Sequence, residues 1–451
     1  MAGPREVPVD PERDAQFDKA FALLTELVDF EEVQRQFPVR ENAVYTVSLT
    51  LWMLVYQRMC PDASLEAAVK KMIQSKPSFL PDNKRVREGT LSSNTSTYSQ
   101  ARSRLPREAV EWLAQEVSQS LIQAARPSLG DRRVFVIDGT TITLAPETKL
   151  RERFPPASDK HVWPVALLTV AHELASGAAL IPEVGAMYGE QAVSETQQIS
   201  GLLKQMPPGS VVMGDVAFGI FGVAHAVASA GHSFLFRLNK QRFQSLQKKA
   251  RLISSQEDPL PVWSLTWQPT KDNLSTNSDL PREAALEVRL HEIVIHEELT
   301  LWLVTDLADD SQTLSDLYHH RGDVEIDIRN LKVVLDTENI RARSEPLFFK
   351  ELLMSIVSYN LVTQFRRQAA ALIKQPPRRM SFKRTWTTFR EFLLSAMYTE
   401  PVGWRNQYVR ALSYAMLDKL PLRPGRSYER EAYRWTPKCN NFKRREPPPH
   451  E

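Results

Sequence analysis

The chain has 451 residues, 42% of them hydrophobic and 25% charged, which is enough for two or three globular domains with real cores. It has two cysteines, no long apolar run and a polar N-terminus, which exclude a disulfide-rich or membrane-spanning protein and favour the cytoplasm. The net charge of +3 is uneven, because residues 366–451 hold 19 Lys and Arg against 7 Asp and Glu. Such a basic region favours a polyanionic partner.

The first 125 residues are expected to be helical. Residues 44–59 form a long apolar segment typical of a buried helix, and Ser64 is suited to cap the next one. Residues 97–105 predict a short basic helix that Pro106 ends, followed directly by another helix. Such a pair either reads DNA in a major groove or is a simple packing unit, and the sequence leaves both interpretations open.

From residue 131 the pattern changes to strands. Residues 134–137 are an apolar run that ends in Asp138, and residues 211–214 are another that ends in Asp215. A single Asp after a strand is more often a turn or cap residue than a catalytic one. The joint arrangement of two such residues is what indicates a site.

Strands and helices alternate along the rest of the chain. A hairpin is predicted over residues 163–184 and an amphipathic helix over residues 190–204. A β-rich insertion over about 241–308 precedes a helix at 314–335, and a longer helix follows at 346–371.

The predicted helix around residue 325 carries four reactive side chains on one arc. At about 100° per residue, the following four fall within about 60° of one another, along the edge of the apolar stripe: Tyr318, Arg321, Glu325 and Lys332. His319 and His320 fall off this arc and are interpreted as structural or solvent-facing. For one such helix taken alone, an ordinary solvated face is the commoner interpretation.

Two aspartates after strands and a glutamate on a helix make a set of oxygen ligands without His or Cys. Such a set suits Mg²⁺ or Mn²⁺, which prefer oxygen. Used in pairs, these ions activate an attacking hydroxyl and stabilise the leaving oxygen in phosphodiester displacement. We therefore expect Asp138, Asp215 and Glu325 to be the catalytic, metal-binding residues.

These motifs resemble those of the insertion-sequence-four family of bacterial DDE transposases. The spacing Tyr-x2-Arg-x3-Glu-x6-Lys that begins at Tyr318 matches the YREK signature of that family. The run Asp-Gly-Thr-Thr at Asp138 looks like its first catalytic block, and Asp-Val-Ala-Phe at Asp215 resembles its second. The resemblance covers most of the chain and is most secure from about 130 to 340.

The resemblance implies an α/β fold, in which an RNase H-like mixed sheet flanked by helices occupies residues 126–345. The β-rich insertion at about 241–308 lies within this catalytic domain. A helical N-terminal DNA-binding domain is expected over residues 1–125. A helical basic region over residues 346–451 is expected to contact DNA or to form a dimer.

The implied function is cut-and-paste transposition. The protein would bind the terminal inverted repeats of an insertion sequence as a homodimer, cleave the ends through hairpins and join them to double-stranded target DNA. Two Mg²⁺ or Mn²⁺ ions per active site would be held by Asp138, Asp215 and Glu325. The protein would be cytoplasmic and associated with the bacterial nucleoid.

The resemblance also implies the DNA contacts. Tyr318, Arg321 and Lys332 would grip phosphate, for which a hydroxyl, a guanidinium fork and an ammonium are suitable donors. Arg237 and Lys240 either contact the DNA backbone or are solvated loop charges.

A base flipped out of the DNA would stack on a tryptophan of the insertion. Trp263 and Trp267 are the candidates, and the sequence does not choose between them. Trp302 lies on an apolar strand and is expected in the core.

Two other functions are compatible with these residues. One is a metal-dependent nuclease that cuts without strand transfer. The other is a non-catalytic DNA-binding repressor derived from a transposase. The presence of all three carboxylates argues against the repressor, which has no chemical need for them.

Overall fold

One mixed sheet of nine strands forms the framework of the described chain, in the order β3-β2-β1-β4-β5-β9-β8-β7-β6. The computed structural model describes residues 30–38, 43–60, 64–76, 80–158, 160–253, 260–276, 280–296, 299–334, 337, 340–396 and 401–421. The first five strands along the chain are β1 (Val134–Thr143), β2 (Val165–Glu173), β3 (Glu183–Ala186), β4 (Val211–Gly214) and β5 (Ser233–Arg237).

These five strands have the topology of an RNase H-like fold. β1, β2 and β3 pair antiparallel, whereas β1, β4 and β5 pair parallel. The strands of the parallel part are buried and rich in Val and Phe, as expected for a sheet covered on both faces. The α/β fold predicted from the sequence is confirmed.

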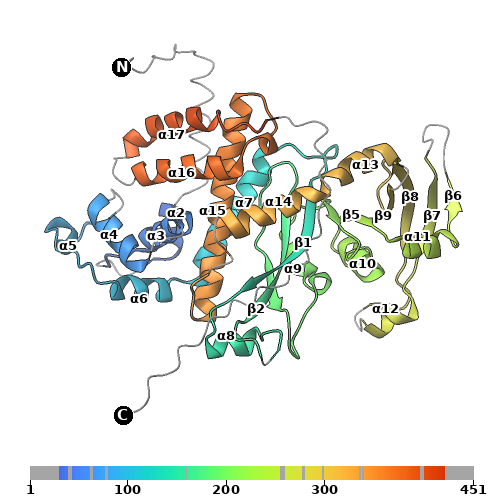
Figure 1. Cartoon of the computed structure of the whole chain (residues 1–451), viewed down its shortest axis with the longest axis horizontal. Coiled ribbons are helices and arrows are strands. Elements are labelled where there is room, and N and C mark those ends of the chain that lie inside the picture. Colours follow the sequence, from blue (N-terminus) through green and yellow to red (C-terminus); the bar gives the residue numbers. More distant parts are fainter. Residues whose placement is uncertain are drawn as a thin grey trace.

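The segment predicted as a β-rich insertion extends this sheet. β9 pairs antiparallel with β5, and β8, β7 and β6 follow outward toward the right-hand end in Figure 1. The strands and helices of this part are β6 (Arg251–Leu252), β7 (Val262–Trp267), β8 (Leu286–His296), β9 (Leu299–Thr305), α11 (Lys240–Gln247) and α12 (Lys271–Thr276).

Helices from the two ends of the chain pack together on one side of the sheet (Figure 1). The first group is α2 (Phe30–Gln36), α3 (Val47–Met59), α4 (Leu65–Ser75), α5 (Lys84–Arg87), α6 (Ser96–Arg104) and α7 (Arg107–Ala124). The second group is α15 (Glu345–Leu372), α16 (Phe382–Ala396) and α17 (Pro401–Ala415). At the two ends of the chain, residues 1–29 of the predicted region 1–125 and residues 422–451 of the predicted region 346–451 lie outside the described residues.

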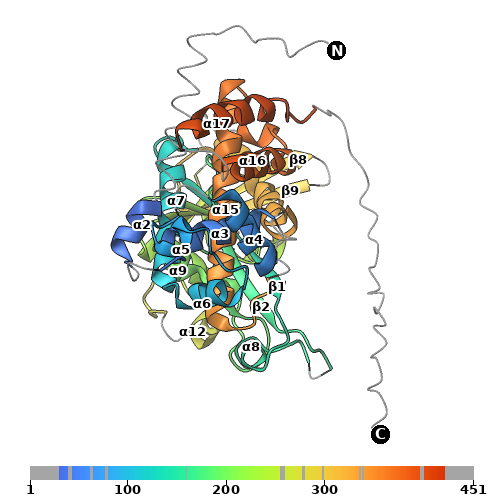
Figure 2. The ribbon, with the colours of Figure 1, turned by 90° about the vertical axis from the view of Figure 1, so that its left-hand side faces the viewer.

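Helix α15 is the centre of this arrangement. Most of its 28 residues are buried, because α3, α7, α16 and α17 pack around it. In the view of Figure 2, which faces this side, the N-terminal helices lie around α15. The described helices include none that is long and apolar enough to span a membrane.

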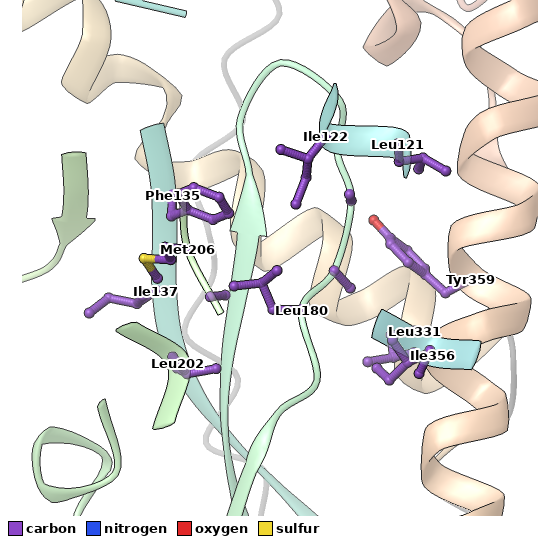
Figure 3. Close-up of a cluster of buried hydrophobic side chains, with 14 of the residues drawn as sticks. Leu121, Ile122, Phe135, Ile137, Leu180, Leu202, Met206, Leu331, Ile356 and Tyr359 are labelled. Atoms are coloured by element: carbon purple, nitrogen blue, oxygen red, sulfur yellow. The ribbon is translucent and has the colours of Figure 1, made fainter. Parts of the chain in front are cut away.

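The two faces of β1 belong to different hydrophobic clusters. Phe135 and Ile137 pack in the cluster of Figure 3, with side chains of α7 and α15. Val134 and Val136 pack on the other face, against side chains of α13 (Ser311–His319) and α14 (Asp323–Arg329). Since side chains alternate along a strand, Asp138 belongs to the α14 face and Gly139 to the opposite one.

The remaining short elements connect these layers. They are α8 (Thr148–Arg153), α9 (Ile199–Leu203), α10 (Phe221–Ser229), the 3₁₀ turns η1 (Glu195–Gln197), η2 (His320–Gly322) and η5 (Pro377–Arg379), and the π-helix η3 (Asn330–Val334). The helix predicted over residues 190–204 is thus reduced to η1 and α9.

Two predicted boundaries were wrong. Asp138 does not end its strand, because β1 stays paired with β2 up to Thr143, although its pairing with β4 ends at Val136. The helix predicted over residues 314–335 is interrupted by η2, which contains Gly322, a poor helix former. Its last position, residue 335, lies outside the described residues.

Candidate active site

Asp138 of β1 and Asp215, which directly follows β4, lie at the same end of two neighbouring parallel strands. The register pairs Val136 with Met213, so two residues further along each chain bring the two aspartates to the same height. Oδ1 of Asp138 accepts a hydrogen bond from the Gly139 N–H at 2.9 Å. Oδ1 of Asp215 accepts one from the Ala217 N–H at 2.9 Å. Both carboxylates therefore keep their second oxygen for another partner.

The segment from α13 to α14 brings Arg321 and Glu325 over this end of the sheet. Asp310 caps α13, where it accepts a hydrogen bond from the Thr313 N–H at 2.9 Å. The turn η2 then changes the course of the chain, and Glu325 falls in the first turn of α14. An acidic residue there interacts favourably with the helix dipole.

The guanidinium of Arg321 joins the three predicted metal ligands. It lies 3.2 Å from Asp138, 3.5 Å from Asp215 and 2.7 Å from Glu325. The Arg321 side chain is only 16% exposed, whereas Glu325 is 56% exposed. Three carboxylates from β1, from the loop after β4 and from α14 thus converge on one cation.

Burial shifts the pKa values of two side chains at this site, Asp138 and Tyr318. It raises the pKa of Asp138, and the positive charge of Arg321 opposes that rise. Burial also raises the pKa of Tyr318. The Tyr318 hydroxyl donates a hydrogen bond of 3.3 Å to the Gly214 carbonyl and the side chain is 8% exposed. Tyr318 therefore fastens α13 to the end of β4 and does not lie on an open arc with Arg321.

The oxygen atoms gathered here have the chemistry of a hard-cation site. In their present positions, however, no three His, Cys, Asp or Glu side chains of the described residues stand close enough together to hold a metal ion. The guanidinium of Arg321 lies between the carboxylates. The donor set of Asp138, Asp215 and Glu325 fits a divalent cation. Because the Arg321 guanidinium pairs with the same carboxylates, a cation held by all three would have to displace it.

The other predicted DNA contacts are spread around the site. Arg237, at the end of β5, has a buried Nε without a hydrogen-bond partner among the described residues. Its charge acts on Tyr318, which places it near the site. Lys240 is exposed at the start of α11. Lys332 is partly buried in η3.

The two tryptophan candidates differ in exposure. Trp267 is 7% exposed and packs edge-to-face on Phe221 at 5.4 Å, so little of its ring is available for stacking. Trp263 is partly buried against Phe243, also edge-to-face, at 5.7 Å. Trp302, expected in the core, is partly buried and donates a hydrogen bond of 3.1 Å to Glu292. Trp163, which the sequence did not single out, is 57% exposed.

Arg378 of η5 binds two acidic side chains of α14. Its guanidinium bonds both oxygens of Asp327, at 3.1 and 2.8 Å, and its Nε lies 3.1 Å from Asp323. Burial by itself would raise the pKa of Asp327, but the charge and hydrogen bonds of Arg378, together with the charges of His172 and Arg366, hold that pKa below its usual value. No sequence motif indicated this pair, because the two residues lie 51 positions apart.

Two more polar residues near the site were missed by sequence reasoning. Arg242 of α11 donates a hydrogen bond of 2.9 Å to the Val216 carbonyl, which ties α11 to the loop that carries Asp215. Glu195, in η1, lies near Asp138 and Asp215. Burial and the negative charges of those two residues raise its pKa. An isolated Glu between two strands carries no recognisable spacing.

The short basic helix predicted near residue 100 is α6, and one of its arginines is held in an ion pair within the protein. Arg102 forms an ion pair with Glu351 of α15 and is 12% exposed. Arg104 stays exposed and donates a hydrogen bond of 3.2 Å to Gln100. The Arg102 pair packs α6 against α15, so its guanidinium is not available to DNA in this arrangement.

Comparison with known families identifies the domain that contains these residues. The transposase DDE domain family matches residues 129–361, more than half of the chain. The chain belongs to this family. The matched DDE domain begins just before β1, ends within α15 and includes Asp138, Asp215, Arg321 and Glu325. The protein is therefore a transposase of the DDE type, whose domain uses divalent metal ions.

One solved structure similar to this DDE transposase is described as a cryo-EM structure of the piggyBac transposase synaptic complex with hairpin DNA. It shares 11% sequence identity, with 92% of this chain and 87% of that chain covered and a TM-score of 0.39. A similarity this weak does not indicate a shared mechanism. No curated protein matches the sequence.

Proposed function

We propose that this protein is a cut-and-paste DNA transposase of the insertion-sequence-four type. It binds the terminal inverted repeats of its element, cleaves the ends, by way of hairpins, and joins them to target DNA. The observation that supports this proposal most is the convergence of three carboxylates on Arg321 within a DDE domain. The spacing from Tyr318 to Lys332 supports assignment to the bacterial YREK group.

Asp138, Asp215 and Glu325 would hold two Mg²⁺ or Mn²⁺ ions. When bound, these ions would supply charge stabilisation and a more acidic nucleophile for phosphodiester displacement. Backbone N–H groups bind one oxygen of Asp138 and one of Asp215, so that their second oxygens, which pair with Arg321, would be the ones to receive an ion. Glu325, more exposed, is left to adjust on α14.

Arg321 and Lys332 would bind phosphate groups of the transposon end. A guanidinium can engage two phosphate oxygens at once, whereas a Lys ammonium acts as a point charge. Tyr318 would act on DNA only through the backbone segment that it fastens, since its hydroxyl donates to Gly214. Arg237 and Lys240 would extend the contact along the DNA backbone.

The larger assembly is also part of the proposal. Residues 1–125 and 346–451 would add further DNA contacts to those of the catalytic domain, with two copies of the chain in the synaptic complex. Trp263, which is less buried than Trp267, is the better of the two candidates for stacking on a flipped base. The protein would act in the cytoplasm, at the nucleoid.

The test is an assay on DNA that carries the element's terminal inverted repeats, with Mg²⁺ or with EDTA. We expect hairpinned ends and joined products only with Mg²⁺. Asp138→Asn and Glu325→Gln should reduce both products below detection and still bind the DNA. Asp316→Asn, an exposed carboxylate on α13, is the matched control and should behave as wild type.

The alternatives give different results in the same assay. Cleavage without joined products would favour a metal-dependent nuclease. Binding without any cleavage would favour a repressor derived from a transposase. If the Glu325→Gln variant lost DNA binding to the same degree as cleavage, its role as a metal ligand would be contradicted.

A further inference from the structure

A fourth carboxylate reaches the candidate active site from the opposite face of the sheet. Glu195 lies in η1, in the connection between β3 and α9. The site described above is reached from the α14 face, to which Asp138 belongs. Gly139 belongs to the other face, and its missing side chain leaves room that the Glu195 carboxylate fills. A Cβ atom at Gly139 would overlap an oxygen of that carboxylate.

The edge of β1 is open at this point. Pairing between β1 and β4 ends at Val136, whereas Asp138 and Gly139 are paired only with β2. A side chain from the opposite face can therefore approach around the uncovered edge. Because Gly139 directly follows Asp138, the Glu195 oxygen that packs against Gly139 lies beside Asp138, and the negative charges of Asp138 and Asp215 add to burial in raising the pKa of Glu195.

The carboxylate of Glu195 lacks a compensating partner. Within the described part of the chain, no hydrogen bond donor or ion-pair partner engages its side-chain oxygens, although Thr169 donates to its backbone carbonyl at 3.5 Å. Arg321 acts on it only at longer range. A half-buried carboxylate beside two others is unfavourable unless a cation joins them.

We propose that Glu195 is a further ligand of the divalent cation held by Asp138 and Asp215. This inference rests on the proposed function, because it adds an oxygen to the same metal site. Glu195 supplies that oxygen from the α9 face, and the triad supplies its oxygens from the α14 face. Gly139, in the Asp-Gly-Thr-Thr run, is required because a side chain there would push the Glu195 carboxylate away.

The chain offers a matched control in Glu183. Its carboxylate also packs where a glycine, Gly201, lacks a side chain, and it is also half-buried. The charge that acts on it is Lys204, and neither Asp138 nor Asp215 is among its electrostatic partners. Glu183 thus has the same local packing without the metal site.

The test measures Mn²⁺ binding to the full-length protein without DNA, by electron paramagnetic resonance of free Mn²⁺ and by the melting temperature with Mn²⁺ or EDTA. Glu195→Gln should weaken Mn²⁺ binding by about tenfold or more, as loss of a supporting carboxylate does. Gly139→Ala should weaken it as well. Glu183→Gln and Gly201→Ala should bind Mn²⁺ within about twofold of wild type, since neither Asp138 nor Asp215 is an electrostatic partner of Glu183.

The outcomes separate this inference from the proposed function. In EDTA, Glu195→Gln should melt at the same temperature as wild type or higher, because a repelled charge is gone. The inference would be overturned if Glu195→Gln bound Mn²⁺ as tightly as wild type while Asp138→Asn bound it weakly. A clear fall in the melting temperature of Glu195→Gln in EDTA would also overturn it. Unchanged Mn²⁺ binding in Asp138→Asn would overturn the proposed function itself.

Discussion

At the scale of single residues, Arg321 holds the candidate site together. Its guanidinium is largely buried and pairs with Asp138, Asp215 and Glu325. Without it, the three carboxylates would repel one another in a partly desolvated site. The oxygens that it engages are those expected to bind metal, so Arg321 and divalent cations compete for the same partners.

This competition predicts the behaviour of Arg321→Gln. In EDTA the variant should melt at a lower temperature than wild type, because the carboxylates lose their counter-charge. Added Mn²⁺ should raise its melting temperature by more than it raises that of wild type, since a competitor has been removed. The measurement is a thermal melt of both proteins in EDTA and in Mn²⁺.

The control for Arg321, which lies in η2, is Arg329→Gln, which changes an exposed arginine at the end of the following helix α14. It should respond to Mn²⁺ as wild type does. If Arg321→Gln gained less from Mn²⁺ than wild type, Arg321 would be a residue that positions the carboxylates and does not compete with the metal.

At the scale of elements, α14 is held between two sets of charges. Arg321 and Glu325 face the candidate site, while Asp323 and Asp327 are held by Arg378 from η5. Asp327 is fully buried and both of its oxygens accept hydrogen bonds from Arg378, while His172 lies 4.0 Å away. The chain after α15 thereby fixes the helix that carries Glu325.

Arg378→Gln should lower the free energy of unfolding by about 3–5 kcal/mol at pH 7, because a buried carboxylate loses the guanidinium that bonds both of its oxygens. The pKa of Asp327 in the folded protein lies below its ordinary value. The pair therefore contributes stability at pH values above the unfolded pKa, and this contribution is lost as the pH falls through the folded pKa. The difference in the free energy of unfolding between variant and wild type should therefore be smaller in acid than at pH 7. Urea unfolding of both proteins at pH 7 and in acid would measure it.

A surface ion pair provides the comparison for Arg378. Arg343 lies 3.6 Å from Glu147 and is 83% exposed. Arg343→Gln should change the free energy of unfolding by less than about 1 kcal/mol. Equal effects of the two substitutions would mean that Asp327 is not dependent on Arg378.

At the scale of the whole molecule, the two ends of the chain share one core with the sheet. A single hydrophobic cluster extends from the N-terminal helices through α15 to α17 and also includes Phe135 of β1. Trp52 of α3 stacks on Trp404 of α17 at 6.0 Å, and Phe365 of α15 packs on Phe389 of α16 at 5.1 Å. Regions predicted as separate along the sequence are therefore packed into one another.

This continuity predicts cooperative unfolding. Phe389→Ala, at a fully buried position of α16, should lower the free energy of unfolding by about 3–5 kcal/mol. The N-terminal helices and the sheet should still unfold in one transition, as circular dichroism and tryptophan fluorescence followed together would show. Leu417→Ala, 76% exposed, is the control and should have little effect. Separate transitions for the two regions would contradict a shared core.

Particular residues show how far sequence reasoning reached. The order of Asp138, Asp215 and Glu325 and the spacing around Arg321 were visible in the chain, because residue type and separation are properties of sequence. The helical wheel failed for Tyr318, since it assumed one straight helix where η2 intervenes. The partnership of Arg378 with Asp327 and the approach of Glu195 to Gly139 had no signal, because both join distant segments.

The sequence by itself determined the transposase DDE family and the α/β class, and it predicted a set of oxygen ligands for a metal site. These follow from local pattern, since alternating strands, helices and motif spacings are read within short stretches. Only the tertiary structure decided which groups meet. The register of β1 with β4 levels the two aspartates, and the early end of that pairing opens the edge to Glu195. Strand pairing and helix packing depend on contacts between residues far apart in the chain, which local patterns do not encode.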